Sequence, residues 1–384
     1  MTAETQAAIP AAAALWTFPA VLLAAFLLAW AAEASQFFIS QGLALALLAW
    51  LQTLPEFAVE GVIAWHGDVS LMTANFTGAI RLLVGLGWPM VFAVRAWKAR
   101  KTEGIWKARI RLEDEHCVEV LSLLPPMAYF GWIIFKGSLT VLDAAVLLAI
   151  YSGYLWMVSR IPSREHEEMS DIPRVSQWIL SQPGKGRVWA TVLVFGAGGA
   201  LLAVAAHPFV GSMMSLSVVL GVPTFVFVQW VSPLLSEFPE KVSAFYWART
   251  VTKAPMAMMN MVSSNINEWT VLAALIPIVY SISSGHMMAV PFDAHQRLEL
   301  LLTLAQSVLG FFFLANLEFR AHEAAGLFLL WAVQFVFPNS HIPVTAAYLA
   351  WVVVEVALLL TGRRRWVAFS AFRKEWTAAQ SGRA

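Results

Sequence analysis

Gln-Thr-Leu-Pro-Glu at residues 52–56 and Ser-Glu-Phe-Pro-Glu at residues 236–240 occur once in each half of the chain, inside long apolar stretches. Each Pro-Glu pair is followed by a segment that begins with asparagine, 19 positions later at Asn75 and 20 positions later at Asn260. The two units are therefore nearly in register, which predicts an internal repeat.

The composition places these units in a membrane. The chain has 384 residues, of which 59% are hydrophobic and 13% are charged. A soluble domain carries about a quarter charged residues. We therefore exclude a soluble enzyme, a nucleic-acid binder and a disordered scaffold. The single cysteine, Cys117, excludes a framework of disulfides.

Long apolar runs predict about eleven transmembrane helices, because each crossing needs roughly 20 apolar residues. The fold class we expect is an all-α polytopic membrane protein, with two inverted five-helix repeats plus one extra C-terminal helix. The amino end has no basic stretch before its apolar run, so we expect a retained helix and not a cleaved signal. The predicted spans are 15–33, 37–65, 70–94, 118–135, 138–159, 188–207, 212–247, 254–284, 298–317, 323–337 and 342–361.

Basic residues lie mostly on one side of this arrangement. Threading eleven spans places 21 of the 25 Lys and Arg residues in the loops and tail of a single side. By the positive-inside rule this side is the cytoplasm, so the amino end is outside and the carboxyl tail is cytoplasmic. We expect a bacterial inner membrane. The loop within the first unit then faces outside and that of the second faces inside, so the repeats are inverted.

The same threading divides the chain into four parts. We predict a first repeat over 1–160, a cytoplasmic loop over 161–187, a second repeat with the extra helix over 188–361, and a cytoplasmic tail over 362–384.

The repeated motif has the chemistry of a cation site. A proline in mid-span removes a backbone N–H and frees a carbonyl oxygen at membrane depth. The glutamate beside it adds a charged oxygen, and Ca²⁺ takes six to eight such ligands. After the second motif, Asn260, Ser264 and Glu268 recur every four residues and form one polar stripe. In the first half, Ala79 and Leu83 stand where the stripe has Ser264 and Glu268.

These motifs resemble the two alpha repeats of the cation/Ca²⁺ antiporter superfamily, whose best known members are the sodium/calcium exchangers. The similarity covers about 40–95 and 225–285, and it implies ion binding by the Pro-Glu glutamates, the hydroxyl before them and the polar stripes. The ligands implied are Glu56, Thr53, Glu240, Ser264 and Glu268, and the stripes add Asn75 and Asn260 as candidates. Glu237 is an eighth candidate, either as a ligand or as the partner of Lys241 four residues later.

The chain departs from this family pattern in several places. The family usually has Gly-Thr-Ser before Pro-Glu, where this chain has Leu-Gln-Thr at 51–53 and Leu-Ser-Glu at 235–237. In the helix after the first motif, the family has Gly-Ser-Asn where this chain has Gly-Ala-Ile at 78–80. Arg81 does not occur in the family pattern. The departures predict fewer cation sites than a full exchanger has, with ligands concentrated in the second half.

The function that we expect is cation antiport by alternating access at a midplane carboxylate site, with Ca²⁺ exchanged for Na⁺ or H⁺. One alternative is an exchanger of Na⁺ or another monovalent cation for H⁺. Another is a membrane protein that binds cations without transporting them. The expected partners are cations and the lipid bilayer and not nucleic acid; no cofactor is expected. We find no nucleophile–base pair within the spans, so we expect no enzyme.

Other polar residues within the spans have more local explanations. For Arg81 we expect an ion pair with Glu60. The alternative is that its guanidinium takes the place of a cation at a site that this chain has lost. We expect Glu355 to have a packing or lipid-interface role, and Gln306 and Gln334 to form interhelical hydrogen bonds. The eight histidines fall in loops or near span ends and show no ligand spacing.

Overall fold

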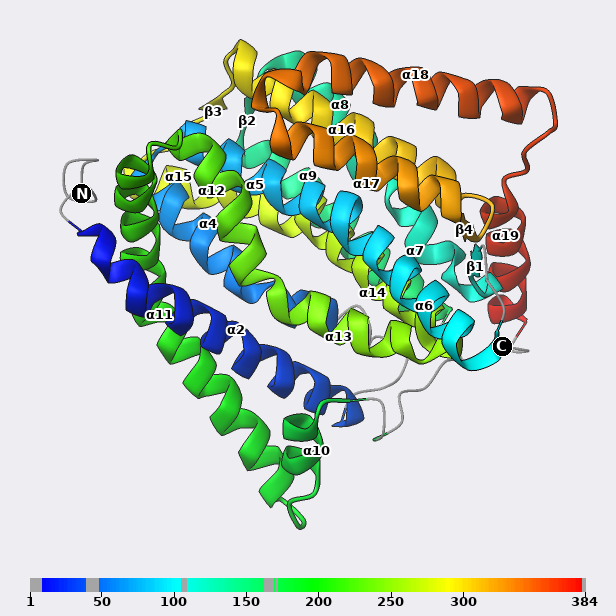
Figure 1. Ribbon diagram of the computed structural model, residues 1–384, viewed down its shortest axis with the longest axis horizontal. Helices are drawn as coiled ribbons and strands as arrows, with labels where there is room; N and C mark the ends of the chain where they lie inside the picture. The colour runs from blue at the N-terminus through cyan, green and yellow to red at the C-terminus, as the bar shows by residue number, and fades with distance from the viewer. Residues whose placement is uncertain (1–8, 39–47, 105–108, 162–168, 170–171, 382–384) are drawn as a thin grey trace.

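The computed structural model describes the chain except for residues 1–8, 39–47, 105–108, 162–168, 170–171 and 382–384 (Figure 1). The described residues form helices, with four short strands in the loops. In this part of the chain, eight helical runs are long and apolar enough to cross a membrane, and two shorter apolar helices accompany them. The polytopic all-α class is thereby confirmed. The predicted span 37–65 lies partly outside the described residues.

The first half contains α2 (Ala14–Ser35), α4 (Leu54–His66), α5 (Val69–Leu82), α6 (Trp88–Glu103), β1 (Arg109–Arg111), α7 (Cys117–Ser122), α8 (Leu124–Lys136), β2 (Ser138–Leu139) and α9 (Val141–Arg160). After the short α10 (Arg174–Leu180), the second half contains α11 (Gly186–Leu220), α12 (Thr224–Ser236), α13 (Phe238–Arg249), α14 (Ala254–Asn267), α15 (Ala273–Ser284), β3 (Val290–Pro291), α16 (Ala294–Leu314), β4 (Glu318–Arg320), α17 (Ala321–Val336) and α18 (His341–Leu360). The tail forms α19 (Val367–Gln380).

The predicted helix boundary near residue 210 is wrong. Instead of ending at 207, α11 runs unbroken from Gly186 to Leu220 and carries Pro208 in its interior. Membrane helices tolerate such a proline where neighbouring groups satisfy the freed backbone. The break comes at Gly221, which ends the helix with φ at 67°, and at Pro223 two residues later.

A pair of helices, α2 and α11, lies along one flank of the molecule (Figure 1). The two helices pack along each other and also contact α4 and α12. Their contact includes a polar bridge, in which the hydroxyls of Thr17 and Ser212 lie 2.8 Å apart. The pair therefore covers the face of the two motif-bearing segments.

The strands join loops from opposite halves. β1 pairs antiparallel with β4, with Ile110 opposite Phe319, and β2 pairs antiparallel with β3, with Leu139 opposite Val290. β1 and β4 belong to loops that threading places on the cytoplasmic side, whereas β2 and β3 belong to loops placed outside. The strand pairs therefore agree with the predicted partition of the loops.

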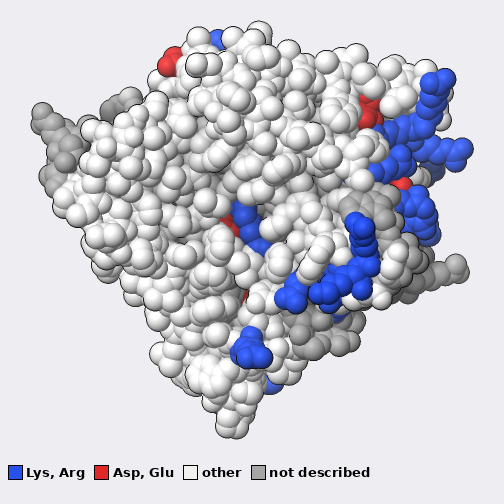
Figure 2. Space-filling view, in the orientation of Figure 1, with Lys and Arg blue, Asp and Glu red and all other residues white. Residues whose placement is uncertain are grey.

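Charged side chains follow the same division. Figure 2 shows the Lys and Arg side chains gathered toward the end of the molecule that holds β1, β4 and α19, while most of the visible surface is uncharged. The carboxyl-terminal tail is packed against the rest of the molecule at this end. α19 contacts α7, and the Ala368 N–H donates to the Ala315 carbonyl, 3.0 Å away.

Candidate cation site

Both Pro-Glu motifs interrupt their helices at the same motif position. The chain is helical up to Gln52, turns at Thr53 and resumes as α4, while α12 ends at Ser236 and α13 begins after Glu237. The prolines stand at the second position of α4 and α13, where they have no N–H to donate back along the chain. The glutamates follow them directly, so both carboxylates start a new helix at a break in the backbone.

The Glu56 carboxylate accepts hydrogen bonds from both halves of the molecule. The Asn75 Nδ2 donates to Glu56 Oε1 and, at 2.7 Å, to Glu60 Oε2. The Ser236 hydroxyl, from the second motif, donates to Glu56 Oε2. Glu56 therefore lies where the two repeats meet.

Glu240 and Glu268 are buried with little hydrogen bonding. Both are 0–1% exposed, and none of their four carboxylate oxygens has a hydrogen-bond partner among the described residues. The charges of Glu56, Glu237 and Glu240 all act on Glu268, so the four carboxylates form one cluster. Buried carboxylates without partners are costly and need a ligand or a proton.

The helix that carries Glu268 is distorted at that residue. Glu268–Leu272 forms a π-helical turn between α14 and α15, and Leu83–Gly87 forms a matching π turn between α5 and α6. Each turn begins eight residues after the asparagine that opens its stripe, so the repeat extends to the backbone. Such turns widen the helix and leave carbonyls differently oriented, as at many functional sites.

α14 carries further buried polar side chains near Glu268 in the chain. Ser264 lies beside Glu240 but closes no well-oriented hydrogen bond. Asn265 and Asn267 are also buried, and neither side-chain amide has a partner within the described chain. Their unbonded oxygens are hard ligands of the kind that Ca²⁺ takes.

The remaining candidates have identifiable partners. Glu237 pairs with Lys241, with Oε2 and Nζ 2.5 Å apart in the interior. The Thr53 hydroxyl donates to the Trp50 carbonyl at 2.9 Å. Asn260 Nδ2 donates to Gln52 Oε1 at 3.2 Å and its own oxygen is unbonded. The ion pair is one of the two roles left open for Glu237.

Arg81 does not pair with Glu60, contrary to our expectation. Its Nη2 lies 2.6 Å from Glu299 Oε2, and both side chains are buried. Glu60 instead accepts from Asn75. Glu299 is 218 residues from Arg81 in the chain, so the local spacing that suggested Glu60 gave no sign of this partner.

Gln306 and Gln334 form the interhelical hydrogen bonds expected of them, and Gln229 joins the same group. Arg81 Nη1 donates to Gln334 Oε1 at 3.0 Å, and Gln334 Nε2 donates to Gln306 Oε1 at 3.2 Å. Gln229 Nε2 donates to Glu299 Oε2 at 2.9 Å. Glu355, in turn, accepts from Trp351 and Arg364, which fits the packing role expected of it.

Comparison with known protein families identifies the family of this chain. The model of the family described as sodium/calcium exchanger protein matches residues 9–160 and 190–338. The chain belongs to the sodium/calcium exchanger family. The matched regions contain both Pro-Glu motifs and both π turns, so the resemblance inferred from the motifs is confirmed.

Solved exchanger structures share this fold. A crystal structure of the H⁺/Ca²⁺ exchanger CAX is 32% identical, with a TM-score of 0.86 over 97% of this chain and 92% of that chain. The sodium-calcium exchanger NCX_Mj, at 17% identity, gives a TM-score of 0.57 over 85% and 99%. The structure of native YfkE gives 13% and 0.59 over 82% and 88%. Comparison with curated proteins finds no match.

Sequence reasoning about this exchanger missed several polar residues of the site. Ser236 and Gln52 hold the same motif position, and both bond across the repeat interface. Their matched positions were the available signal. Asn265 and Asn267 are buried amides of the same helix that lie off the four-residue stripe, so helical spacing alone did not single them out.

Two histidines form a cluster that their sequence positions did not predict. In the structure His295 and His341 lie on either side of Glu299, with one ligand atom from each of the three within 4.8 Å of the others. His295 and Glu299 are four residues apart, which is a helical ligand spacing, but His341 comes from another helix.

Proposed function

We propose that this exchanger moves Ca²⁺ across the membrane in exchange for protons, at a site formed by Glu56, Glu240 and Glu268. The observation that carries the proposal is the set of four unbonded carboxylate oxygens on the buried Glu240 and Glu268, close to Glu56. A hard cation taking several oxygen ligands satisfies such a cluster. Ser264, which lies beside Glu240, supplies a neutral oxygen.

Competition at one set of carboxylates couples the two ions. When Ca²⁺ leaves, the carboxylates are again buried without partners, and proton uptake removes the negative charge that makes this state costly. Ca²⁺ entry from the other side then displaces the protons. Exposure to each side in turn requires movement of helices around a fixed site, and the α2–α11 pair on the flank is our candidate for that movement.

The lack of side-chain oxygens in the first repeat favours protons over Na⁺ as the counter-ion. Ala79 and Leu83 supply no side-chain oxygen at two of the three stripe positions. Each bound Na⁺ needs an oxygen cage, whereas a proton needs only a carboxylate. The CAX structure that is 32% identical to this chain is described as an H⁺/Ca²⁺ exchanger.

The orientation belongs to the same proposal. The gathering of basic residues at the end that holds β1, β4 and α19 supports a cytoplasmic carboxyl tail in a bacterial cell membrane.

Radioactive calcium uptake into proteoliposomes tests the function. Vesicles with an outward proton gradient, with an outward Na⁺ gradient and without a gradient are compared. We expect uptake with the proton gradient alone. Glu240→Gln should abolish it, while Glu113→Gln, a change to an exposed carboxylate outside the site, should leave it intact.

Two other results would change the proposal. Uptake driven only by Na⁺ would retain the calcium site and replace the counter-ion. Changes in pH that are driven by Na⁺, without any calcium movement, would favour the monovalent exchanger. The loss of side-chain oxygens from the stripe in the first repeat also suggests that alternative.

A further inference from the structure

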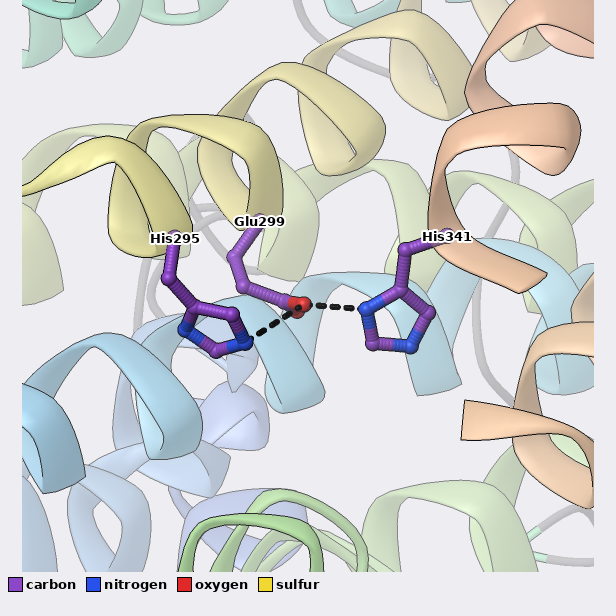
Figure 3. Close-up of side chains that lie close together, drawn as sticks. All are labelled: His295, Glu299 and His341. Atoms are coloured by element: carbon purple, nitrogen blue, oxygen red, sulfur yellow. Dashed lines mark ion pairs between the residues drawn. The ribbon is translucent and has the colours of Figure 1, made fainter. Parts of the chain in front are cut away.

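A second polar cluster lies apart from the carboxylates proposed to carry calcium. It comprises His295 and Glu299 on α16 and His341 at the start of α18, and their side chains point toward one another (Figure 3). α16 begins directly after β3, and both histidines stand within the first two positions of their helices. The cluster is therefore at the end of the molecule opposite β1, β4 and α19 (Figure 1).

The three ligand atoms are close to the arrangement that a small metal ion needs. His295 Nε2 lies 3.8 Å from Glu299 Oε1, His341 Nδ1 is in contact with the same oxygen, and all three lie within 4.8 Å of one another. Bonds of about 2.1 Å in a tetrahedral site place ligand atoms about 3.4 Å apart. Small rotations of the side chains would bring the three atoms to that spacing.

The two oxygens of Glu299 have different surroundings. Oε2 accepts from Arg81 Nη2 at 2.6 Å and from Gln229 Nε2 at 2.9 Å. Within the described part of the chain, Oε1 has no hydrogen-bond donor beyond its ion-pair contacts with the two imidazoles. Carboxylates that ligate metals are commonly held by hydrogen bonds of this kind on their other oxygen. Arg81 and Gln229 would thus orient the ligand without occupying its free position.

An ion can reach the cluster from water. The His295 side chain is 55% exposed, at the second position of its helix, and its ring packs edge-on against Phe225. Glu299 is buried and His341 is 10% exposed, so the ion would sit at the surface with its carboxylate ligand beneath it.

We propose that His295, Glu299 and His341 form a binding site for Zn²⁺ or a similar transition-metal ion, separate from the transported calcium. Two imidazole nitrogens and one carboxylate oxygen suit zinc, with a fourth position left for water. Ca²⁺ takes oxygen ligands and is disfavoured here. A bound ion would join α16 to α18, and this inference does not rest on the proposed calcium transport.

Titration calorimetry of the purified full-length exchanger with Zn²⁺, in excess Ca²⁺, tests the site. We expect one saturable site per chain, with affinity at least tenfold weaker in His295→Ala. Co²⁺ bound at the same site should give the visible absorption bands of a tetrahedral ion, and these should disappear in His295→Ala. Glu240→Gln should bind Zn²⁺ as the unaltered protein does, because it changes only the calcium site.

His322→Ala is a matched control. His322 is also an exposed histidine at the second position of a helix, with Nε2 3.9 Å from the buried Glu323, but it belongs to no three-residue cluster among the described residues. It should retain the site. Absence of saturable Zn²⁺ binding, or equal binding by His295→Ala and the unaltered protein, would overturn the proposal and leave His341 and Glu299 as an ion pair only.

Discussion

At the scale of single residues, this exchanger buries two kinds of ionisable group. Arg81 and Lys241 are paired, with Glu299 and Glu237 respectively, whereas the carboxylate oxygens of Glu240 and Glu268 have no hydrogen-bond partner among the described residues. The paired groups satisfy their charge within the protein, and the unpaired carboxylates are the ones that we propose to bind an ion. Glu237 and Glu299 are glutamates like Glu240 and Glu268, so the paired and unpaired carboxylates differ in their surroundings and not in residue type.

Arg81→Met should destabilise the fold. The substitution removes the buried guanidinium that pairs with Glu299 Oε2, and breaking a buried pair costs roughly 3–5 kcal/mol. We expect a clear fall in the thermal unfolding midpoint in detergent, partly reversed in the double variant Arg81→Met/Glu299→Gln. Transport should gain no Na⁺ dependence, because Arg81 contacts Glu299 and not the calcium carboxylates. A gain of Na⁺ dependence would instead show that the guanidinium fills a cation site.

Lys241→Met should strengthen calcium binding. Without Lys241, the Glu237 carboxylate adds an unpaired negative charge beside Glu268, and charges separated by several ångströms interact by a few kcal/mol inside a protein. We expect the dissociation constant for Ca²⁺, measured by equilibrium binding, to fall by about tenfold or more. Lys241→Arg and the double variant Lys241→Met/Glu237→Gln should stay near the original value. An unchanged constant in Lys241→Met would give the pair a purely structural role.

At the scale of elements, the two repeats share more than their sequence motif. Each has a helix break just before Pro-Glu and a π turn eight residues after the opening asparagine of its stripe. Breaks and π turns place backbone and side-chain oxygens at membrane depth without exposing them to lipid. Close packing between helices holds these irregular segments in place.

Gly78→Ala should disrupt that packing. A Cβ at Gly78 would lie 1.8 Å from the Gln229 carbonyl oxygen, so α5 and α12 would have to separate. Overpacking of this kind costs typically about 1–3 kcal/mol. We expect a lower unfolding midpoint and slower calcium transport.

Gly153→Ala in α9 is the comparison for this change. A Cβ there meets nothing within 4 Å, and alanine favours a helix over glycine by about 1 kcal/mol. Its midpoint should stay the same or rise. Equal effects of the two substitutions would mean that the close approach of α5 and α12 does not limit stability.

At the scale of the whole molecule, the two halves are joined at both ends. β1 pairs with β4 at the end rich in basic residues, and β2 pairs with β3 at the other. Each strand pair takes one strand from each half of the chain. The pairs tie together loops that the charge distribution had already assigned to common sides.

Labelling from each side of the membrane checks this arrangement. In a Cys117→Ala background, Arg363→Cys should react with a membrane-impermeant thiol reagent only from the cytoplasm. Met287→Cys, at a residue that is 74% exposed near β3, should react only from outside. Labelling of both from the same side would contradict the pairing of sides, and exchanged sides would reverse the orientation but not the fold.

The sequence alone determined the membrane class, the repeat and the position of the motif glutamates, because apolar run length, proline and spacing act locally along the chain. It placed the boundary between the spans 188–207 and 212–247 too early, since α11 continues to Leu220 with Pro208 in its interior. A proline inside a membrane helix is tolerated where neighbours satisfy the freed backbone, and those neighbours are set by the tertiary structure. Partners distant in the chain were decided only by the tertiary structure. Arg81 meets Glu299, Ser236 meets Glu56, and His341 joins His295, because the rotation and placement of packed helices determine which buried groups come within reach.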